Sequence, residues 1–509
     1  MSTILSYDLG TGGVKACLFA GDGTLLQHAF AEYATEFPQP LWQEQKPADW
    51  WNALIRVTRV LEETAADELR TVEAIGVSGH SLGVVAIDAQ GELVLPYTPI
   101  WSDGRAHAQA DAYFHRANHE EWYRCTGGGF PSQLYAAFKL LWYKQNMPEA
   151  YENACMFLGS KDYINFRLTG TLATDFSYAS GSGIYDLRRH QYDRERAKDI
   201  GISAAKLPEP VPATQVLDGL TEQAARELHL PQGAKVVAGG VDNACMALGA
   251  NCFREGQSYT SLGTSAWVAV SSSTPVIDPA TLPYVFEHCV PGQYVSATCI
   301  FSAGRSFRWI RDNFCASIAS RAEEQGEDAY DWMTQLAAHS SMGANRLLFH
   351  PALSGGSAID PAENMRGCLL GLDLRHTLSD VIRAAMEGIA LNLRIALDAL
   401  RKHTQINAPM LLVGGGAKSA LWRQIFADAY EMDILETAVG QNAGALGAAA
   451  LAALGAGLWS DFAPIERAHT VHSLCAPIPE NAATYQKLLP VFCFMARQQA
   501  ALAEQLAAL

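Results

Sequence analysis

The sequence predicts an α/β fold in which two duplicated domains flank a deep cleft. The chain has 509 residues, more than one hydrophobic core usually supports, and its 49% apolar and 18% charged residues are typical of a globular protein. The stretch SYDLGTGGVKACL from Ser6 also recurs in outline as SYTSLGTSAWVAV from Ser258. A chance recurrence in a glycine-rich chain is the alternative explanation. The duplication predicts one domain in residues 1–250 and a second in residues 251–509.

The first glycine-rich stretch predicts a tight strand–turn–strand. Residues 3–7 resemble a buried strand, and the strand pattern resumes at residues 14–19. The spacing fits neither the dinucleotide fingerprint nor the Walker phosphate loop. What remains is a hairpin whose turn, Gly10, Thr11 and Gly12, lets backbone N–H groups approach an anion, with Asp8 able to hold a hydrated Mg²⁺. A plain hairpin is the alternative.

The second copy predicts a matching turn at Gly263, Thr264 and Ser265. If the two turns face each other across the cleft, they grip the phosphates of one nucleotide from both sides.

A third glycine cluster predicts a nucleotide-binding turn. The stretch APMLLVGGGAKSALWRQIFADAY runs from a buried strand through three glycines into an amphipathic helix. Gly415 and Gly416 offer a flat surface on which a purine can lie, and the helix N-terminus near Ser419 offers free N–H groups.

Charge and composition argue against a nucleic-acid partner and against a membrane-spanning segment. A net charge of −16 and a pI near 5.3 argue against a nucleic-acid surface. The 11 cysteines lack Cys-x-x-Cys spacing and the N-terminus lacks an export signal, which favours the cytoplasm. The uncharged run from Ala443 to Trp459 is too short to span a membrane and predicts a tightly packed internal helix.

These motifs together resemble a known superfamily. The stretches at residues 8–15, 261–265 and 414–416, with GALGAAALAA from Gly444, are similar to the phosphate, adenosine and connecting motifs of the ribonuclease H-like, actin-like ATPases. Within that superfamily the chain resembles the FGGY carbohydrate kinases. KLLWYKQN from Lys139 matches the core of the family's first signature, with departures at Ala136 and Tyr143, and residues 367–387 match the second. FPQPLWQEQKPADWW from Phe37 is similar to the xylulokinase-like branch.

The resemblance implies an ATP-dependent sugar kinase that uses Mg²⁺, with the sugar and the catalytic base in the N-terminal domain and the nucleotide in the C-terminal domain. D-xylulose, converted to D-xylulose 5-phosphate, is the first candidate. Kinases for L-xylulose, ribulose or a gluconate-like sugar are alternatives, as are an actin-like ATPase that is not a kinase and a sugar sensor. Sugar and ATP are the expected partners, and a homodimer stays open.

The resemblance also implies roles for individual residues. Asp242 falls at the position of the family's catalytic aspartate, where it accepts the proton of the sugar hydroxyl, and Asn243 lies beside it in the substrate site. Asp242 as a helix cap is the alternative. Gly304 is expected near the nucleotide. Lys15 fits a phosphate contact and a solvated strand residue equally well.

Two loops are expected to line the sugar pocket. GVSGHSLGVVAID supplies His80 and Ser81, and IWSDGRA supplies Trp101, Asp103 and Arg105: an aromatic face, an acceptor and a fork of donors. A core tryptophan and a local salt bridge are the alternatives for the second loop. In xylulose-type kinases the first loop usually reads G-Q-x-H-G, whereas Leu82 occupies the histidine position here, so the sugar stays open.

Overall fold

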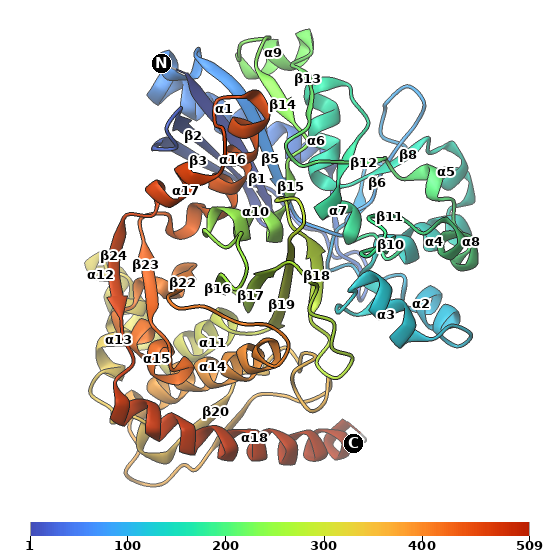
Figure 1. The fold of residues 1–509 in the computed structure, drawn as a ribbon. Coiled ribbons are helices and arrows are strands. Elements are labelled where there is room, and N and C mark those ends of the chain that lie inside the picture. The colour runs from blue at the N-terminus through green and yellow to red at the C-terminus, as the bar shows by residue number, and fades with distance from the viewer. Residues whose placement is uncertain (1, 508–509) are drawn as a thin grey trace.

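The computed structural model describes residues 2–507 and contains one large mixed sheet in each half of the chain (Figure 1). In the first sheet, β1 is antiparallel to β2 and parallel to β5, and the strand order is β13-β14-β5-β1-β2-β3, with β15 beside the end of β5. These strands are β1 (Thr3–Gly10), β2 (Gly13–Ala20), β3 (Leu25–Glu32), β5 (Val72–Gly79), β13 (Val216–Gly219), β14 (Lys235–Val237) and β15 (Gly240–Val241).

The second sheet repeats this topology. Its order is β18-β19-β17-β16-β22-β23-β24, and β16 is antiparallel to β17 and parallel to β22, as β1 is to β2 and β5. Its strands are β16 (Ser258–Leu262), β17 (Ala266–Ser272), β18 (Tyr284–Glu287), β19 (Tyr294–Ile300), β22 (Met410–Val413), β23 (Ile434–Thr437) and β24 (Val471–Cys475). The predicted duplicated α/β fold is therefore confirmed.

Helices and short strand pairs complete the two units. The helices of the first half are α1 (Pro47–Leu69), α2 (His107–Phe114), α3 (His119–Thr126), α4 (Ala136–Asn146), α5 (Pro148–Asn153), α6 (Ser160–Thr169), α7 (Phe176–Ser180), α8 (Arg194–Ile200), α9 (Glu222–Leu228) and α10 (Asp242–Gly249). Those of the second half are α11 (Gly304–Phe314), α12 (Ala316–Gln325), α13 (Ala329–Ala337), α14 (Leu378–Arg401), α15 (Ala420–Tyr430), α16 (Ala443–Ala456), α17 (Ala463–Ala468) and α18 (Pro479–Ala507). The short strands are β4 (Glu44–Gln45), β6 (Val85–Ile87), β7 (Thr98–Pro99), β8 (Met156–Leu158), β9 (Thr174–Asp175), β10 (Tyr185–Asp186), β11 (Gln191–Tyr192), β12 (Pro210–Val211), β20 (Leu348–His350) and β21 (Cys368–Leu370).

Helices α10 and α16 form a core that both sheets share. Ile4 of the first sheet and Tyr259 of the second belong to one buried cluster with these two helices. Figure 1 shows α16, in orange-red, among the blue strands of the first sheet, although it follows the second sheet in sequence. The two helices pack backbone to backbone, because a Cβ on Gly447 would lie 1.9 Å from the carbonyl oxygen of Cys245. The predicted internal helix is confirmed, and none of the helices in residues 2–507 is long and apolar enough to cross a membrane.

A segment between β5 and β13 carries the predicted sugar loops and touches the second unit. The backbone N–H of Val285 donates to the carbonyl oxygen of Gly127 at 3.0 Å. Phe130 stacks on Tyr284 with a ring separation of 4.3 Å. The glycine-rich loop at residues 127–129 is therefore a contact between the two units.

Candidate active site

Three strands of the first sheet end side by side and bring acidic and polar residues together. The register pairs Asp8 with Ser78 and Gly79 with Val241. The backbone N–H of His80 donates to the carbonyl oxygen of Leu9 at 3.0 Å. Because parallel strands end at the same edge of a sheet, the residues that follow them share one crevice, as ligand-binding residues do in other α/β folds.

The two carboxylates at this edge repel each other. Burial raises the pKa of Asp242 to about 7, and the charge of Asp8 adds to the increase. Burial also raises the pKa of Asp8, opposed by a hydrogen bond that the Ser78 hydroxyl donates to Oδ1 at 2.7 Å. A carboxyl whose pKa lies close to neutrality fits a general base.

Asp242 does not cap its helix. It is the first residue of α10, and the N-cap is Val241, which provides no capping side chain. The Oδ1 atom of Asp242 accepts from the backbone N–H of Asn243 at 2.8 Å and from its side-chain amide at 3.0 Å. The capping alternative is therefore wrong, and the Asn243 amide is directed at the carboxylate.

A buried polar network holds the backbone just before Asp242. The backbone N–H of Val241 donates to Ser177 Oγ at 3.0 Å, and the Ser177 hydroxyl donates to Asp175. Lys161 lies 2.9 Å from Asp175 and also pairs with Asp162. All five residues are buried, so the network orients the start of α10 without contact with solvent.

The second unit contains a pocket of about 440 Å³, a size suited to a nucleotide. It brings together six of the predicted nucleotide residues: Gly263, Thr264, Gly304, Gly415, Gly416 and Ser419. Ser265 lies next to them in the β16–β17 turn, where its carbonyl oxygen accepts from the N–H of Gly263 at 3.0 Å. Ser419 is the N-cap of α15, since its hydroxyl oxygen accepts from the N–H of Trp422 at 3.2 Å.

Two of the glycines are required by close backbone contacts. A Cβ on Gly304 would lie 2.4 Å from the carbonyl oxygen of Gly263, at the point where α11 begins against the β16–β17 turn. Gly414 has a φ of +95°, and a Cβ there would lie 2.6 Å from the carbonyl oxygen of Leu262. These contacts bring the β16–β17 turn, the start of α11 and the glycine turn after β22 to one pocket.

Sequence reasoning missed the aromatic wall of this pocket. Phe307 stacks on Tyr330 at 5.7 Å and lies 4.8 Å from the Trp422 ring. Trp422 lies on the predicted apolar stripe of its helix, but its partners come from two other helices. The remaining wall residues that were not predicted are Leu262, Arg308, Asp328, Asp331, Thr334, Lys418 and Gln441.

The first hairpin adjoins this pocket. Lys15 Nζ donates to the carbonyl oxygen of Gln441 at 2.9 Å, and Gln441 borders the pocket. Lys15 is a partly exposed residue of β2 and bridges the two units through this hydrogen bond. Gly10, Thr11 and Gly12 are exposed at the turn, and a Cβ on Gly12 would meet nothing within 4 Å. Space for a ligand is present at this turn.

The second predicted sugar loop lies against the first hairpin. Trp101 is half-buried, and its indole N–H donates to Thr11 Oγ1 at 2.9 Å. Asp103 is fully buried and accepts four hydrogen bonds: three from Arg105 and one from the backbone N–H of Gln43. Arg105 also pairs with Glu44 at 2.7 Å. The local salt bridge is therefore present, and Asp103 has no free lone pair for a sugar hydroxyl.

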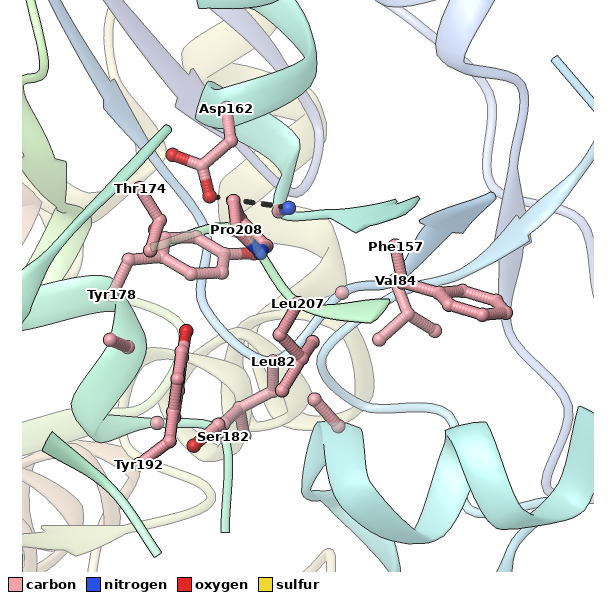
Figure 2. A pocket seen from close by; sticks show the side chains of 15 residues that line it. Leu82, Val84, Phe157, Asp162, Thr174, Tyr178, Ser182, Tyr192, Leu207 and Pro208 are labelled. Carbon is pink, nitrogen blue, oxygen red and sulfur yellow. Dashed lines mark hydrogen bonds between the residues drawn. The ribbon is translucent and has the colours of Figure 1, made fainter. Parts of the chain in front are cut away.

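The first predicted sugar loop is closed. His80 is 1% exposed and neither ring nitrogen has a hydrogen-bond partner; burial lowers its pKa to about 4. Ser81 is also buried. Figure 2 shows the cavity lined by Leu82, Tyr178 and Tyr192, with the Asp162 carboxylate accepting from the backbone N–H of Gly159. Its volume of about 20 Å³ accommodates one water molecule and is too small for a sugar.

The fold and this crevice define a class: duplicated α/β enzymes with a nucleotide pocket in one unit and a carboxylate pair at the facing strand edge of the other. The family model of the FGGY carbohydrate kinases, N-terminal domain, matches residues 3–249, and that of the C-terminal domain matches residues 258–456. The chain belongs to the FGGY family of carbohydrate kinases and is a phosphotransferase acting on a sugar hydroxyl, with ATP as phosphoryl donor.

Individual relatives support the same conclusion. The chain is 28% identical over 460 residues to the xylulose kinase of Bacillus subtilis, covering 90% of this chain and 89% of the relative. It is also 28% identical over 505 residues to the gluconokinase of that organism, covering 97% and 96%. A crystal structure of ligand-bound xylulose kinase from Lactobacillus acidophilus aligns with a TM-score of 0.90 at 27% identity, covering 99% of this chain and 100% of that one. The xylulokinase-like branch is confirmed.

Proposed function

We propose that this kinase transfers the γ-phosphoryl group of ATP to a hydroxyl of a small ketose, with D-xylulose as the first candidate and D-xylulose 5-phosphate as the product. The observation that carries the proposal is the position of Asp242. It lies at the strand edge shared with Asp8 and His80, in the unit that faces the nucleotide pocket. The sugar hydroxyl would lie between Asp242 and the terminal phosphate.

Asp242 acts as the general base in this proposal. Phosphoryl transfer depends mainly on in-line positioning and charge neutralisation, and the base removes the hydroxyl proton as the bond to phosphorus forms. The Asn243 amide fixes one carboxylate oxygen and leaves the other free to accept that proton. The Gly10–Gly12 and Gly263–Ser265 turns hold the phosphates through backbone N–H groups.

The residues present fit a bound Mg²⁺. Asp8 and Asp242 supply hard oxygen donors at one strand edge, and the charge of Asp8 helps to raise the pKa of Asp242. The described residues contain no group of three or more His, Cys, Asp or Glu side chains that could hold a metal, so Asp8 would bind the ion with water and phosphate oxygens. When bound, Mg²⁺ neutralises charge on the β- and γ-phosphates.

A second candidate substrate is gluconate. The B. subtilis gluconokinase is as similar to this chain as the xylulose kinase, and Leu82 occupies the place of a polar residue of the xylulose-type loop. An apolar side chain at this position weakens discrimination by hydrogen bonding, which otherwise separates related sugars strongly.

We also propose the division of labour between the units and the location of the enzyme. Residues 1–250 hold the sugar and the base, and residues 251–509 hold the nucleotide. The cytoplasm is proposed because all 11 cysteines are free thiols.

The test is ADP release by the wild-type enzyme with ATP, Mg²⁺ and D-xylulose, L-xylulose, D-ribulose or D-gluconate. D-xylulose is expected to give the highest kcat/KM. A higher value with D-gluconate replaces the first candidate with the second. Turnover that is equal with and without every sugar contradicts the proposal.

A further inference from the structure

A fully buried lysine joins the two predicted sugar loops. Lys139, on α4, has an exposed fraction of 0%. Its Nζ donates to the carbonyl oxygen of Leu82 at 2.9 Å and to that of Ile100 at 2.7 Å, and lies 3.4 Å from the carbonyl oxygen of Trp101. Leu82 belongs to the His80–Gly83 loop, and the other two acceptors lead into the loop that ends at Arg105.

This lysine has no carboxylate partner in residues 2–507. Arg105, which lies nearby, pairs with Asp103 and Glu44, whereas every hydrogen-bond acceptor of Lys139 is a backbone carbonyl. A buried amine without an ion pair is costly, and an apolar residue of similar size would avoid that cost. The hydrogen bonds to the carbonyls are what an apolar residue could not supply.

One of the acceptors is in an unfavourable conformation. Leu82 has a φ of +60°, in the left-handed region that side chains with a Cβ rarely adopt. Strained backbone of this kind persists where the surrounding structure holds it, and it concentrates at ligand sites. Lys139 fixes the direction of this residue's carbonyl group, and the next two residues toward the N-terminus are Ser81 and His80.

We propose that Lys139 is a positioning residue that sets the geometry of the His80–Gly83 loop relative to the Ile100–Arg105 loop, and that it thereby determines sugar affinity and selectivity. The proposal rests on the proposed function, in which the sugar lies beside Asp242; both loops adjoin that strand edge, through the His80 N–H that donates to Leu9 and the Trp101 indole that donates to Thr11. Although the Trp101 indole contacts Thr11 of the first hairpin, the nucleotide pocket shares no lining residue with either loop, so we expect Lys139 to affect the sugar more than ATP.

The test compares Lys139→Met with a matched control, Lys206→Met. Lys206 is also a lysine of the first unit that donates to two carbonyl oxygens, those of Tyr151 and Ala154, but neither belongs to a sugar loop. Steady-state KM for ATP and for the sugar, and the ratio of kcat/KM between D-xylulose and D-ribulose, are measured for each protein.

Lys139→Met is expected to raise the sugar KM at least about 10-fold and to reduce the selectivity ratio, while the ATP KM stays within about twofold. Lys206→Met leaves all three unchanged. A purely structural role would lower the amount of folded enzyme without this split. An unchanged sugar KM and ratio in Lys139→Met, or equal increases in both KM values, overturns the proposal.

Two further measurements keep the test decisive. If Lys139→Met does not fold, Lys139→Arg replaces it, because arginine retains a buried cation but displaces its N–H donors. We expect the sugar KM of this variant to rise and the ATP KM to change little. Unchanged KM values again overturn the proposal. Glycine adopts positive φ freely, so Leu82→Gly should reduce the effect of Lys139→Met in the double variant. Wild-type enzyme that turns over no sugar refutes the proposed function itself, whereas active wild type with unaltered Lys139 variants refutes only this inference.

Discussion

Replacing Asp242 with asparagine should strongly reduce kcat and stabilise the protein, and the stabilisation should depend on pH. The amide has nearly the same shape as the carboxyl group and can still accept from Asn243 through its oxygen. It cannot accept the hydroxyl proton, and it carries no charge to repel Asp8. We expect kcat to fall at least about 100-fold, the range for loss of a general base.

The stability change follows from the pKa of Asp242. A carboxyl pKa raised from 3.8 to about 7 corresponds to at most about 4 kcal/mol of destabilisation by the charged form. Because Asp242 is only partly buried, we expect about 1–3 kcal/mol. The unfolded chain ionises near pH 4 and the folded protein near pH 7, so the destabilisation develops between these values and is complete above about pH 7. Asparagine removes it at pH 8 and changes little near pH 4.

Urea unfolding at pH 5 and pH 8 measures this difference. Asp242→Asn should unfold at a higher urea concentration than wild type at pH 8, and the gain should shrink toward pH 5. Asp67→Asn is the control, because the Asp67 side chain is 92% exposed and its replacement should have a small effect. Near-normal turnover of Asp242→Asn, or an equal stability gain at both pH values, would refute the reasoning.

Three further predictions follow from the site. The kcat/KM for the sugar should rise with pH through about 7, because Asp242 must lose its proton to act as a base; a flat profile from pH 5 to 8 contradicts this role. Gly12→Ala should raise the KM for ATP at least about 5-fold without lowering the melting temperature, since its Cβ meets only open space, whereas Gly233→Ala, equally unobstructed but remote from the site, should change neither. Ser177→Ala should lower kcat about 10-fold with both KM values retained, because the N–H of Val241 loses its acceptor; a change in KM alone would assign Ser177 another role.

Local patterns predicted the fold well. The glycine-rich turn at residues 10–12 follows a stretch with the pattern of a buried strand, the turn at residues 263–265 was predicted because its sequence repeats that stretch, and the structure repeats their topology in both halves. The sequence also predicted the salt bridge between Asp103 and Arg105 as an alternative to sugar binding, because the two residues are only two positions apart.

Features that depend on distant segments could not be predicted. The aromatic wall of the nucleotide pocket combines Phe307, Tyr330 and Trp422 from three helices, and each of them has the pattern of an ordinary core residue. The hydrogen bonds of Lys139 could not be predicted, because their acceptors are backbone carbonyl oxygens of two loops and every residue type carries such an oxygen. The electrostatic coupling of Asp8 and Asp242 likewise depends on the register of three strands.

The crossing of α16 onto the first sheet makes the two halves interdependent. A fragment cut after residue 250 would lose α16, which covers the Ile4 face of the first sheet. Helix α10 would also lose its neighbour, because the glycines of α16 allow the two helices to pack closely. Such a fragment would expose a broad apolar surface and aggregate when expressed alone. Separating the two copies would therefore require a new interior around α10, because the buried cluster there draws residues from both of them.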